Sequence, residues 1–264
     1  MKKNHIKLII IFLINIFCIS SIYLFVNIYG IYSDTKNNDE LAEEIRNNQT
    51  NKEIKDIADN SENNKSEKVE NLKIIQNENS DIKAWLEIEG TNINYPVLQT
   101  TNNDFYLTHN HKKEHSKNGS IFLDKDVDIN KPSTNFLIYG HNKNIKGQLF
   151  EELMNYKNEE YYKTHPNIKL ITNEGEFEYE IISVFLSRVY YKKETDVFRY
   201  YYFINAKNKE EYENFIENCK KEAIYETKKS ARYNEQLLTL STCEYSKKDG
   251  RLAIVAKKKE NKKL

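Results

Sequence analysis

The pattern of hydrophobic and polar positions divides the chain into three parts. Residues 8–29 form an uncharged run of mostly Ile, Leu, Phe and Val, long enough as a helix to cross the hydrocarbon core of a bilayer. Residues 30–66 are rich in Asn, Glu, Lys and Asp, and such a segment buries too little apolar area to offset the cost of ordering it. Residues 67–260 alternate between short apolar runs and polar turns, which predicts a folded domain.

The charges that flank the apolar run predict its orientation. Lys2, Lys3 and Lys7 precede the run, whereas Asp34 and Asp39 follow it. The positive-inside rule therefore places residues 1–7 in the cytoplasm and everything after the run outside the cell, with 30–66 as a stalk. A cleaved signal peptide is the alternative, but its apolar core would be shorter and would end in small residues of the A-x-A type. The pattern favours an uncleaved, single-pass membrane anchor.

Alternation with a period of two predicts that the folded part is mostly β structure. Trp85-Leu-Glu-Ile-Glu alternates clearly, and Asn173-Glu-Gly175 is typical of a hairpin turn because Gly tolerates a positive φ. The predicted strands are 85–89, 93–98, 120–123, 135–139, 168–172, 176–190, 237–242 and 252–256. Strands at this density, without regular intervening helices, favour a closed barrel or a sandwich over a parallel α/β sheet.

Three segments carry apolar residues at helical spacing. Val69, Leu72 and Ile75 predict a short helix packed against the folded domain. Residues 148–163 and 210–227 each place their large apolar side chains on one face, so both are predicted to be amphipathic helices that interrupt the strands.

Composition and charge exclude several classes of protein. Lys+Arg and Asp+Glu each number 40, so the chain has no net charge and is a poor candidate for electrostatic binding of nucleic acid. Aromatic residues make up 12%, which indicates a packed core rather than a wholly disordered chain. Seven Gly and three Pro exclude collagen-like and Pro-rich architectures, and three Cys are too few for a disulfide scaffold.

The three cysteines occupy different settings. Cys18 lies within the apolar run and Cys219 on the apolar face of the last predicted helix, where a free thiol acts as a small hydrophobe. Cys243 ends the run Leu237-Leu-Thr-Leu-Ser-Thr-Cys and precedes a charged loop, which gives a thiol the partial exposure that a nucleophile needs. Arg251 opens the next strand and would lie near Cys243 if the two strands are neighbours. Spacing alone leaves open an ordinary strand-end cysteine beside a surface arginine.

His141 is the best candidate partner for Cys243 among the six histidines. It follows the apolar run Phe136-Leu-Ile-Tyr-Gly and so also emerges from a buried strand into a polar loop. The remaining histidines are expected to be solvated or structural: His5, His109, His111, His115 and His165. The H-x-H-x3-H spacing of three of them has no fourth ligand at the spacing of a structural zinc site, so no metal site is predicted.

In combination, these motifs resemble those of sortases, the cell-surface transpeptidases of Gram-positive bacteria. Thr239-Leu-Ser-Thr-Cys243, Tyr139-Gly-His141-Asn and the following Arg251 carry the resemblance, which extends over most of residues 75–258. Three further segments are similar to class B sortases: 79–97, Asn103-Asp-Phe-Tyr-Leu107 and Gly119-Ser-Ile-Phe-Leu-Asp124. The resemblance implies a mostly β fold, a closed eight-stranded barrel with an N-terminal helix and a long helix inserted before the cysteine strand.

The resemblance also implies a chemistry. The thiolate of Cys243 would attack the Thr carbonyl of a C-terminal sorting signal on a secreted surface protein, which gives a thioacyl-enzyme. His141 would protonate the departing amine and later deprotonate the incoming one, and Arg251 would stabilise the oxyanion or hold the substrate carbonyl. An amine of the peptidoglycan cross-bridge, or of its lipid-linked precursor, would then resolve the intermediate. No cofactor is expected.

The same resemblance implies a groove for the sorting signal. Its expected lining residues are Ser241, Thr242, Glu244, Asn103 and Leu107. The aromatic residues 200–202, which precede the last predicted helix, are candidates to close the groove.

Three alternative functions stay open at this point. A hydrolytic cysteine protease would use the same thiol and imidazole but transfer the acyl group to water. A pilin-polymerising sortase would use the same chemistry on a different acceptor, although the class B–like opening disfavours it. A surface adhesion or scaffold domain would keep Cys243 buried and inert.

Overall fold

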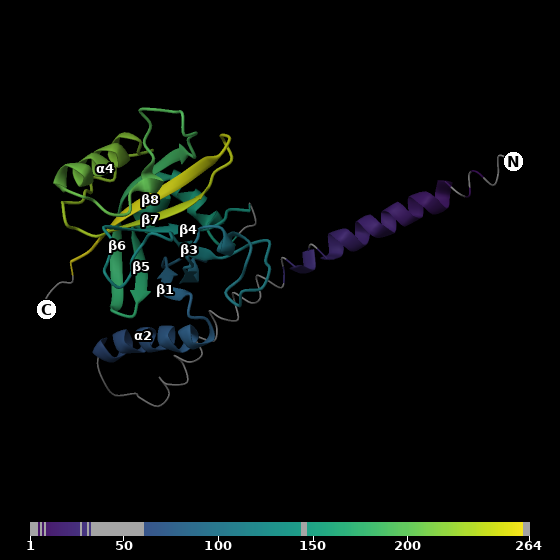
Figure 1. Cartoon of the computed structure of the whole chain (residues 1–264), viewed down its shortest axis with the longest axis horizontal. Coiled ribbons are helices and arrows are strands. Elements are labelled where there is room, and N and C mark those ends of the chain that lie inside the picture. The colour runs from purple at the N-terminus through teal and green to yellow at the C-terminus, as the bar shows by residue number, and fades with distance from the viewer. Residues whose placement is uncertain are drawn as a thin grey trace.

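The computed structural model describes residues 61–143 and 147–260, together with residues 5, 7, 9–26, 28–30 and 32 near the N-terminus (Figure 1). A helix over Ile9–Gly30 has a mean hydropathy of 2.7 and is long and apolar enough to cross a membrane. It covers nearly the same residues as the apolar run 8–29, and its role as an uncleaved anchor stays a prediction. Residues 33–60, most of the predicted stalk, and most of residues 1–7 lie outside the described residues, so the boundaries of these segments stay predictions.

Eight strands close into a barrel in the order β1-β2-β3-β4-β7-β8-β6-β5. The strands are β1 (Ile82–Glu87), β2 (Asn94–Leu98), β3 (Ile121–Leu123), β4 (Asn135–Tyr139), β5 (Asn167–Thr172), β6 (Gly175–Arg188), β7 (Leu237–Cys243) and β8 (Gly250–Lys258). Neighbouring strands are antiparallel except for the two parallel pairs β2–β3 and β4–β7. The predicted closed barrel is confirmed, and Thr172 pairs with Gly175 across the predicted hairpin turn.

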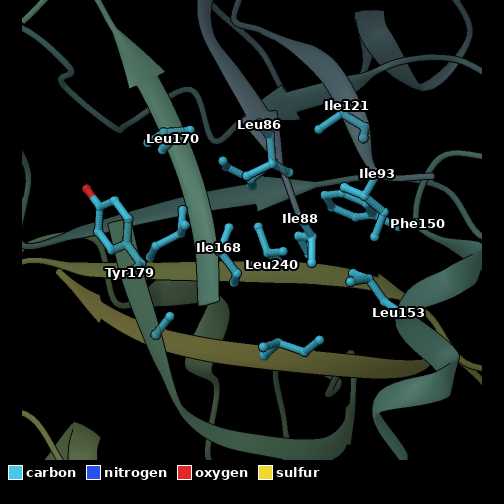
Figure 2. Close-up of a cluster of buried hydrophobic side chains, with 14 of the residues drawn as sticks. Leu86, Ile88, Ile93, Ile121, Phe150, Leu153, Ile168, Leu170, Tyr179 and Leu240 are labelled. Carbon is cyan, nitrogen blue, oxygen red and sulfur yellow. The ribbon is translucent and has the colours of Figure 1, made fainter. Parts of the chain in front are cut away.

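The barrel interior forms the main core. Figure 2 shows Leu86, Ile88, Leu170 and Leu240 within it, and each is at most 1% exposed. Residues from the segment between β4 and β5, among them Phe150, belong to the same buried cluster. Burial of each large apolar side chain contributes about 1.5–3 kcal/mol to folding, so this cluster dominates the stability of the domain.

Helix α4 (Lys209–Lys221) covers the outer face of β8 and its neighbours. Along β8, Leu252 and Ile254 point into the barrel, whereas Ala253 and Val255 belong to the cluster under the helix. Both faces of the strand are therefore buried, which explains why its sequence is continuously apolar rather than alternating.

Helix α4 ends at Lys221, earlier than the prediction of 210–227. Beyond it the chain pairs with β6, since Ala223 forms a bridge with Phe185 and the Ile224 amide donates to the Val184 carbonyl at 2.8 Å. Tertiary backbone pairing replaces the helical hydrogen bonds there. Cys219 is fully buried on the helix face, as predicted, and burial raises the pKa of its thiol.

Helix α2 (Ser61–Glu78) lies against the barrel below β1 and β5 in Figure 1. Its Leu72 and Ile75 pack with Trp85 and Ile171, so the predicted packing of a helix on the domain is confirmed. The helix begins at Ser61, inside the segment assigned to the stalk.

The single helix predicted for 148–163 is wrong. The structure has a 3-10 helix, η2 (Glu151–Lys157), and a separate short helix, α3 (Glu159–Thr164). Asn158 between them is extended, and its side chain accepts a hydrogen bond from the Glu160 amide. Asparagine forms such N-caps readily, and this local bond starts a new helix instead of continuing the old one. Two further 3-10 turns are η1 (Phe105–Leu107) and η3 (Tyr200–Tyr202).

Candidate active site

The parallel pairing of β4 and β7 brings His141 and Cys243 to one edge of the barrel. Tyr139 near the end of β4 pairs with Ser241 near the end of β7. Because parallel neighbours run in the same direction, their carboxyl ends emerge together. His141 lies two residues beyond Tyr139, and Cys243 is the last residue of β7.

Arg251 reaches the same edge through the antiparallel pairing of β7 and β8. Cys243 and Arg251 are directly opposite in this ladder. Side chains of directly opposed residues have Cβ atoms about 4.5–5.5 Å apart. Strands β7 and β8 are therefore neighbours, as the expected proximity of Arg251 to Cys243 requires. The guanidinium lies on the side of the barrel where the thiol emerges.

A cleft of about 370 Å³ opens at this edge, and His141, Cys243 and Arg251 all line it. Four of the five predicted substrate-binding residues line it too: Asn103, Leu107, Ser241 and Thr242. Aromatic side chains supply much of the remaining wall, namely Phe122, Tyr139, Tyr200 and Tyr201. A mostly apolar cleft with a few convergent polar groups is the ordinary form of a substrate site.

His141 is held by a single backbone acceptor. Its Nε2 lies 2.9 Å from the carbonyl oxygen of Leu107. Because a carbonyl oxygen only accepts, Nε2 carries a proton and Nδ1 is the nitrogen left to exchange protons. Burial lowers the pKa of His141, the positive charges of Lys143 and Arg251 lower it further, and the bond to Leu107 opposes them. At neutral pH the imidazole is therefore mostly neutral and able to accept a proton.

Three hydrogen bonds tie the loop after β4 to the cysteine strand. The Gly140 amide donates to the Ser241 carbonyl at 3.1 Å, and the Thr242 hydroxyl donates to the Gly140 carbonyl at 2.8 Å. The Asn142 side chain donates to the Cys243 carbonyl at 3.1 Å. These bonds fix the backbone on both sides of His141 relative to the thiol.

Asp124 is a buried residue behind the cleft that sequence reasoning missed. Its Oδ2 accepts from the Asn103 side chain at 2.8 Å and from the Tyr139 hydroxyl at 3.0 Å. Burial, reinforced by the charge of Asp124, raises the pKa of Tyr139. Asp124 follows the buried strand β3, so it carries the same signal that singled out His141 and Cys243: a polar residue directly after an apolar run.

Glu244 lies elsewhere than predicted. Its carboxylate is buried, bonds the Lys157 side chain and accepts from the Ser246 amide at 3.0 Å. It does not line the cleft, so its contacts are those of a loop anchor. Of the aromatic residues 200–202, the first two line the cleft, whereas Tyr202 is 72% exposed.

Two of the three loop histidines contact each other, since the rings of His109 and His115 lie edge to face with their centroids 5.9 Å apart. The His109 ring stacks on Phe105, His111 is buried, and the side chain of His115 is exposed. Within residues 61–143 and 147–260, no group of three or more His, Cys, Asp or Glu is arranged to hold a metal ion.

Comparison with known proteins agrees with this geometry. The sortase-domain family model matches residues 86–259. The chain is 32% identical over 192 residues to Sortase B of Listeria monocytogenes, covering 71% of this chain and 74% of that one. It is 28% identical over 185 residues to Sortase B of Staphylococcus aureus, covering 69% and 72%.

Solved structures show the same likeness. A crystal structure of Clostridium perfringens sortase B matches with a TM-score of 0.64 at 32% identity, covering 71% of this chain and 99% of that one. A Staphylococcus aureus sortase B–substrate complex matches with a TM-score of 0.70, covering 86% and 97%, and its 23% identity supports the fold alone. Because the family model spans well over half of the chain, the protein belongs to the sortase family of cysteine transpeptidases and is similar to sortase B.

Proposed function

We propose that this sortase B–like transpeptidase cleaves a C-terminal sorting signal after its Thr residue and transfers the client protein to a peptidoglycan amine through a thioacyl-enzyme. The observation that carries the proposal is the meeting of His141, Cys243 and Arg251 in one cleft, from the ends of β4, β7 and β8. Secreted surface proteins with a sorting signal are the proposed clients, and the cross-bridge or its lipid-linked precursor is the proposed acceptor.

In the first half-reaction, the Sγ of Cys243 attacks the Thr carbonyl carbon of the bound signal. Nδ1 of the neutral His141 accepts the thiol proton and delivers it to the nitrogen of the departing peptide, so the C–N bond breaks as the C–S bond forms. Nε2 keeps its hydrogen bond to the Leu107 carbonyl throughout, which keeps the ring oriented.

In the second half-reaction, a primary amine attacks the thioester carbon. His141 accepts a proton from the incoming nitrogen and the thiolate of Cys243 departs, to be protonated again afterwards. The thioester conserves the energy of the original amide bond, so the transfer needs no nucleotide.

Arg251 supplies the electrostatic part of the proposed mechanism. Its Nη1 donates to the Gly250 carbonyl at 2.8 Å, which anchors the guanidinium beside the cysteine while other donor hydrogens stay available. A fixed positive charge in a partly dry cleft stabilises the oxyanion that develops on the Thr carbonyl in both half-reactions.

The apolar N-terminal helix is the proposed membrane anchor, with the N-terminus in the cytoplasm and the catalytic domain outside. The helix over Ile9–Gly30 and the lysines before it support this arrangement. An external catalytic domain would meet both secreted clients and the cell wall.

The test uses the full chain in detergent micelles, with a panel of fluorescence-quenched sorting peptides. We expect Cys243→Ala and His141→Ala to lose measurable cleavage and Arg251→Lys to lose about 10²-fold or more in kcat. Cys219→Ala is the matched control, because that thiol is buried under α4, and it should keep its activity. Full activity in Cys243→Ala or His141→Ala would contradict the assigned roles.

Product analysis separates the alternatives. With a primary amine present, a transpeptidase yields the amine-ligated peptide, whereas a hydrolytic protease yields the free acid in every condition. Preferential ligation to a lysine side chain of a pilin would instead indicate a pilin-polymerising enzyme.

A further inference from the structure

Exposed aromatic side chains gather at the mouth of the catalytic cleft. Within residues 61–143 and 147–260, four Phe, Tyr or Trp side chains are exposed, and three of them border the cleft: Tyr191 (52%), Tyr202 (72%) and Tyr245 (57%). Exposed apolar groups that gather in one place mark an interaction surface. The mechanism above makes no use of these three rings.

Contacts between loops place Tyr191 and Tyr202 at the rim. Val189 and Tyr201 line the cleft. The Val189 amide donates to the Asp249 carbonyl at 2.9 Å, so the segment that holds Tyr191, just after β6, lies beside the loop between β7 and β8. The ring of Tyr202 lies edge to face with that of Tyr201, with the centroids 4.9 Å apart. Both exposed rings therefore belong to segments that form the cleft wall.

Tyr245 completes the rim on the loop after the proposed nucleophile. It lies two residues beyond Cys243, and its hydroxyl donates to the Asn142 carbonyl. Asn142 follows His141 directly, so this tyrosine joins the two loops that carry the thiol and the imidazole. The three tyrosines thus come from three segments that converge on one opening.

Lysines accompany the tyrosines at the rim. Lys192 and Lys193 follow Tyr191 directly, and Lys247 lies two residues after Tyr245. All three lysines are exposed, and none forms an ion pair with a carboxylate in the described part of the chain. These six residues are named the rim surface: Tyr191, Tyr202, Tyr245, Lys192, Lys193 and Lys247.

The acidic residues of the same loops offset only part of this positive charge. Glu194 pairs with Arg188, and the buried Glu244 pairs with Lys157. In the loops 189–199 and 244–249, four exposed lysines outnumber the two remaining aspartates. The rim surface is therefore positively charged, although the whole chain carries no net charge.

Exposed tyrosines mixed with unpaired lysines match the surface of an anionic bilayer. A tyrosine ring buries its apolar body at the level of the lipid headgroups and keeps its hydroxyl in water, while lysines are attracted to anionic headgroups. An anionic polymer in water would use the lysines but leave the rings exposed. A protein partner is a poorer match, because the buried cores of protein interfaces are depleted in lysine.

We propose that the rim surface docks on the membrane that the N-terminal helix spans, with anionic lipid headgroups as its ligand. The natural setting rests on the proposed anchor, which keeps the domain near a bilayer. Docking turns the mouth of the cleft toward the lipid surface, where the proposed lipid-linked acceptor is carried.

Fluorescence quenching by brominated lipids tests the docking. The full chain is placed in nanodiscs whose lipids carry bromine on their acyl chains, so that only tryptophans at the bilayer are quenched. Tyr202→Trp places a reporter on the rim surface. Tyr233→Trp is the matched control, because Tyr233 is also exposed but precedes β7, whereas Cys243 ends it. The parent chain, whose only tryptophan Trp85 is buried, gives the baseline.

The result should depend on the lipid and on the position of the reporter. We expect Tyr202→Trp to be quenched in discs that contain phosphatidylglycerol. In discs of phosphatidylcholine alone, the ratio of docked to undocked molecules should be at least about tenfold lower. Tyr233→Trp should stay at the baseline in both kinds of disc.

Two triple variants, each made in the Tyr202→Trp chain, test the contribution of charge. The first removes the three lysines of the rim surface: Lys192→Gln, Lys193→Gln and Lys247→Gln. It should lower the ratio of docked to undocked molecules at least about tenfold, because each lysine adds to the attraction of anionic lipid. The control removes the same charge from three exposed lysines on and after α4, and it should dock as Tyr202→Trp does: Lys220→Gln, Lys221→Gln and Lys228→Gln.

Three results would overturn the proposal. Co-purification of the chain with the discs shows that the helix is embedded, so absent quenching of Tyr202→Trp in those discs would refute docking and leave the anchor intact. Equal quenching of Tyr233→Trp, or equal losses in the two triple variants, would mean unspecific contact with lipid. A saturable emission change with soluble poly(glycerol phosphate), but no quenching in the discs, would make the rim surface a polymer site. Because the readout is quenching by lipid, it is independent of whether the chain transfers peptides.

Discussion

His111 should make this protein sensitive to acid. Its side chain is 5% exposed, and its Nδ1 is buried without a hydrogen-bond partner among the described residues. Burial lowers the pKa of His111 to about 4, the nearby charge of Lys112 lowers it further, and Glu114 opposes them. The loop that carries His111 also presents the Leu107 carbonyl to His141, so loss of this loop would disturb the cleft.

The size of the stability loss follows from the difference between the pKa of His111 in the unfolded chain and in the folded chain. An imidazole in the unfolded chain has a pKa of about 6.5, and lowering it to about 4 on folding corresponds to about 3 kcal/mol. As the pH falls from about 6.5 to about 4, His111 becomes protonated in the unfolded chain but stays mostly neutral in the folded chain. Stability from this group is therefore complete above about pH 6.5 and is lost progressively down to about pH 4.

Urea unfolding at pH 7 and pH 4, followed by the emission of Trp85, measures this loss. The variant His111→Leu should lose about 3 kcal/mol less than the wild type between the two pH values. His115→Leu is the matched control, because it makes the same substitution in the same loop at an exposed side chain. If His111→Leu and the wild type lose the same stability between pH 7 and pH 4, the buried imidazole is not the source of the acid sensitivity.

Three further substitutions test how the cleft is built. Gly140→Ala would place a Cβ 2.5 Å from the buried ring of Phe150, so we expect a loss of about 1–3 kcal/mol by urea unfolding and reduced kcat/KM. Tyr200→Phe removes the 2.7 Å bond to the Ser241 hydroxyl and should cost about 1–2 kcal/mol in the same assay. Asp124→Ala frees two cleft-lining side chains and should raise KM for a sorting peptide about tenfold with a smaller change in kcat; an unchanged KM would contradict its role.

Local patterning predicted the strands well because most of them carry a clear burial signal. The barrel encloses one face of β7 and β8, and α4 covers the other, so both appear in the sequence as short apolar runs with abrupt polar ends. His141 and Cys243 were singled out because each lies at the abrupt polar end of such an apolar run. The parallel pairing of β4 with β7, which brings them together, could not be predicted from local patterns because it joins segments far apart in the chain.

Other features depend on contacts that no local pattern encodes. The helical spacing of 148–163 is real, yet the cap formed by Asn158 divides the segment. Glu244 follows the cysteine directly, but a lysine from η2 draws its carboxylate away from the cleft. Asn71 is a polar residue whose burial follows only from tertiary packing.

Intact-protein mass spectrometry of the full chain with a sorting peptide, without an acceptor amine, tests directly whether Cys243 forms the thioacyl-enzyme. We expect an adduct equal to the acyl fragment that ends in Thr, located on Cys243 by peptide mapping. A primary amine added afterwards should convert the adduct into ligated peptide and restore the free thiol. Cleavage without any adduct, or an adduct that also forms in Cys243→Ala, would show that Cys243 is not the nucleophile.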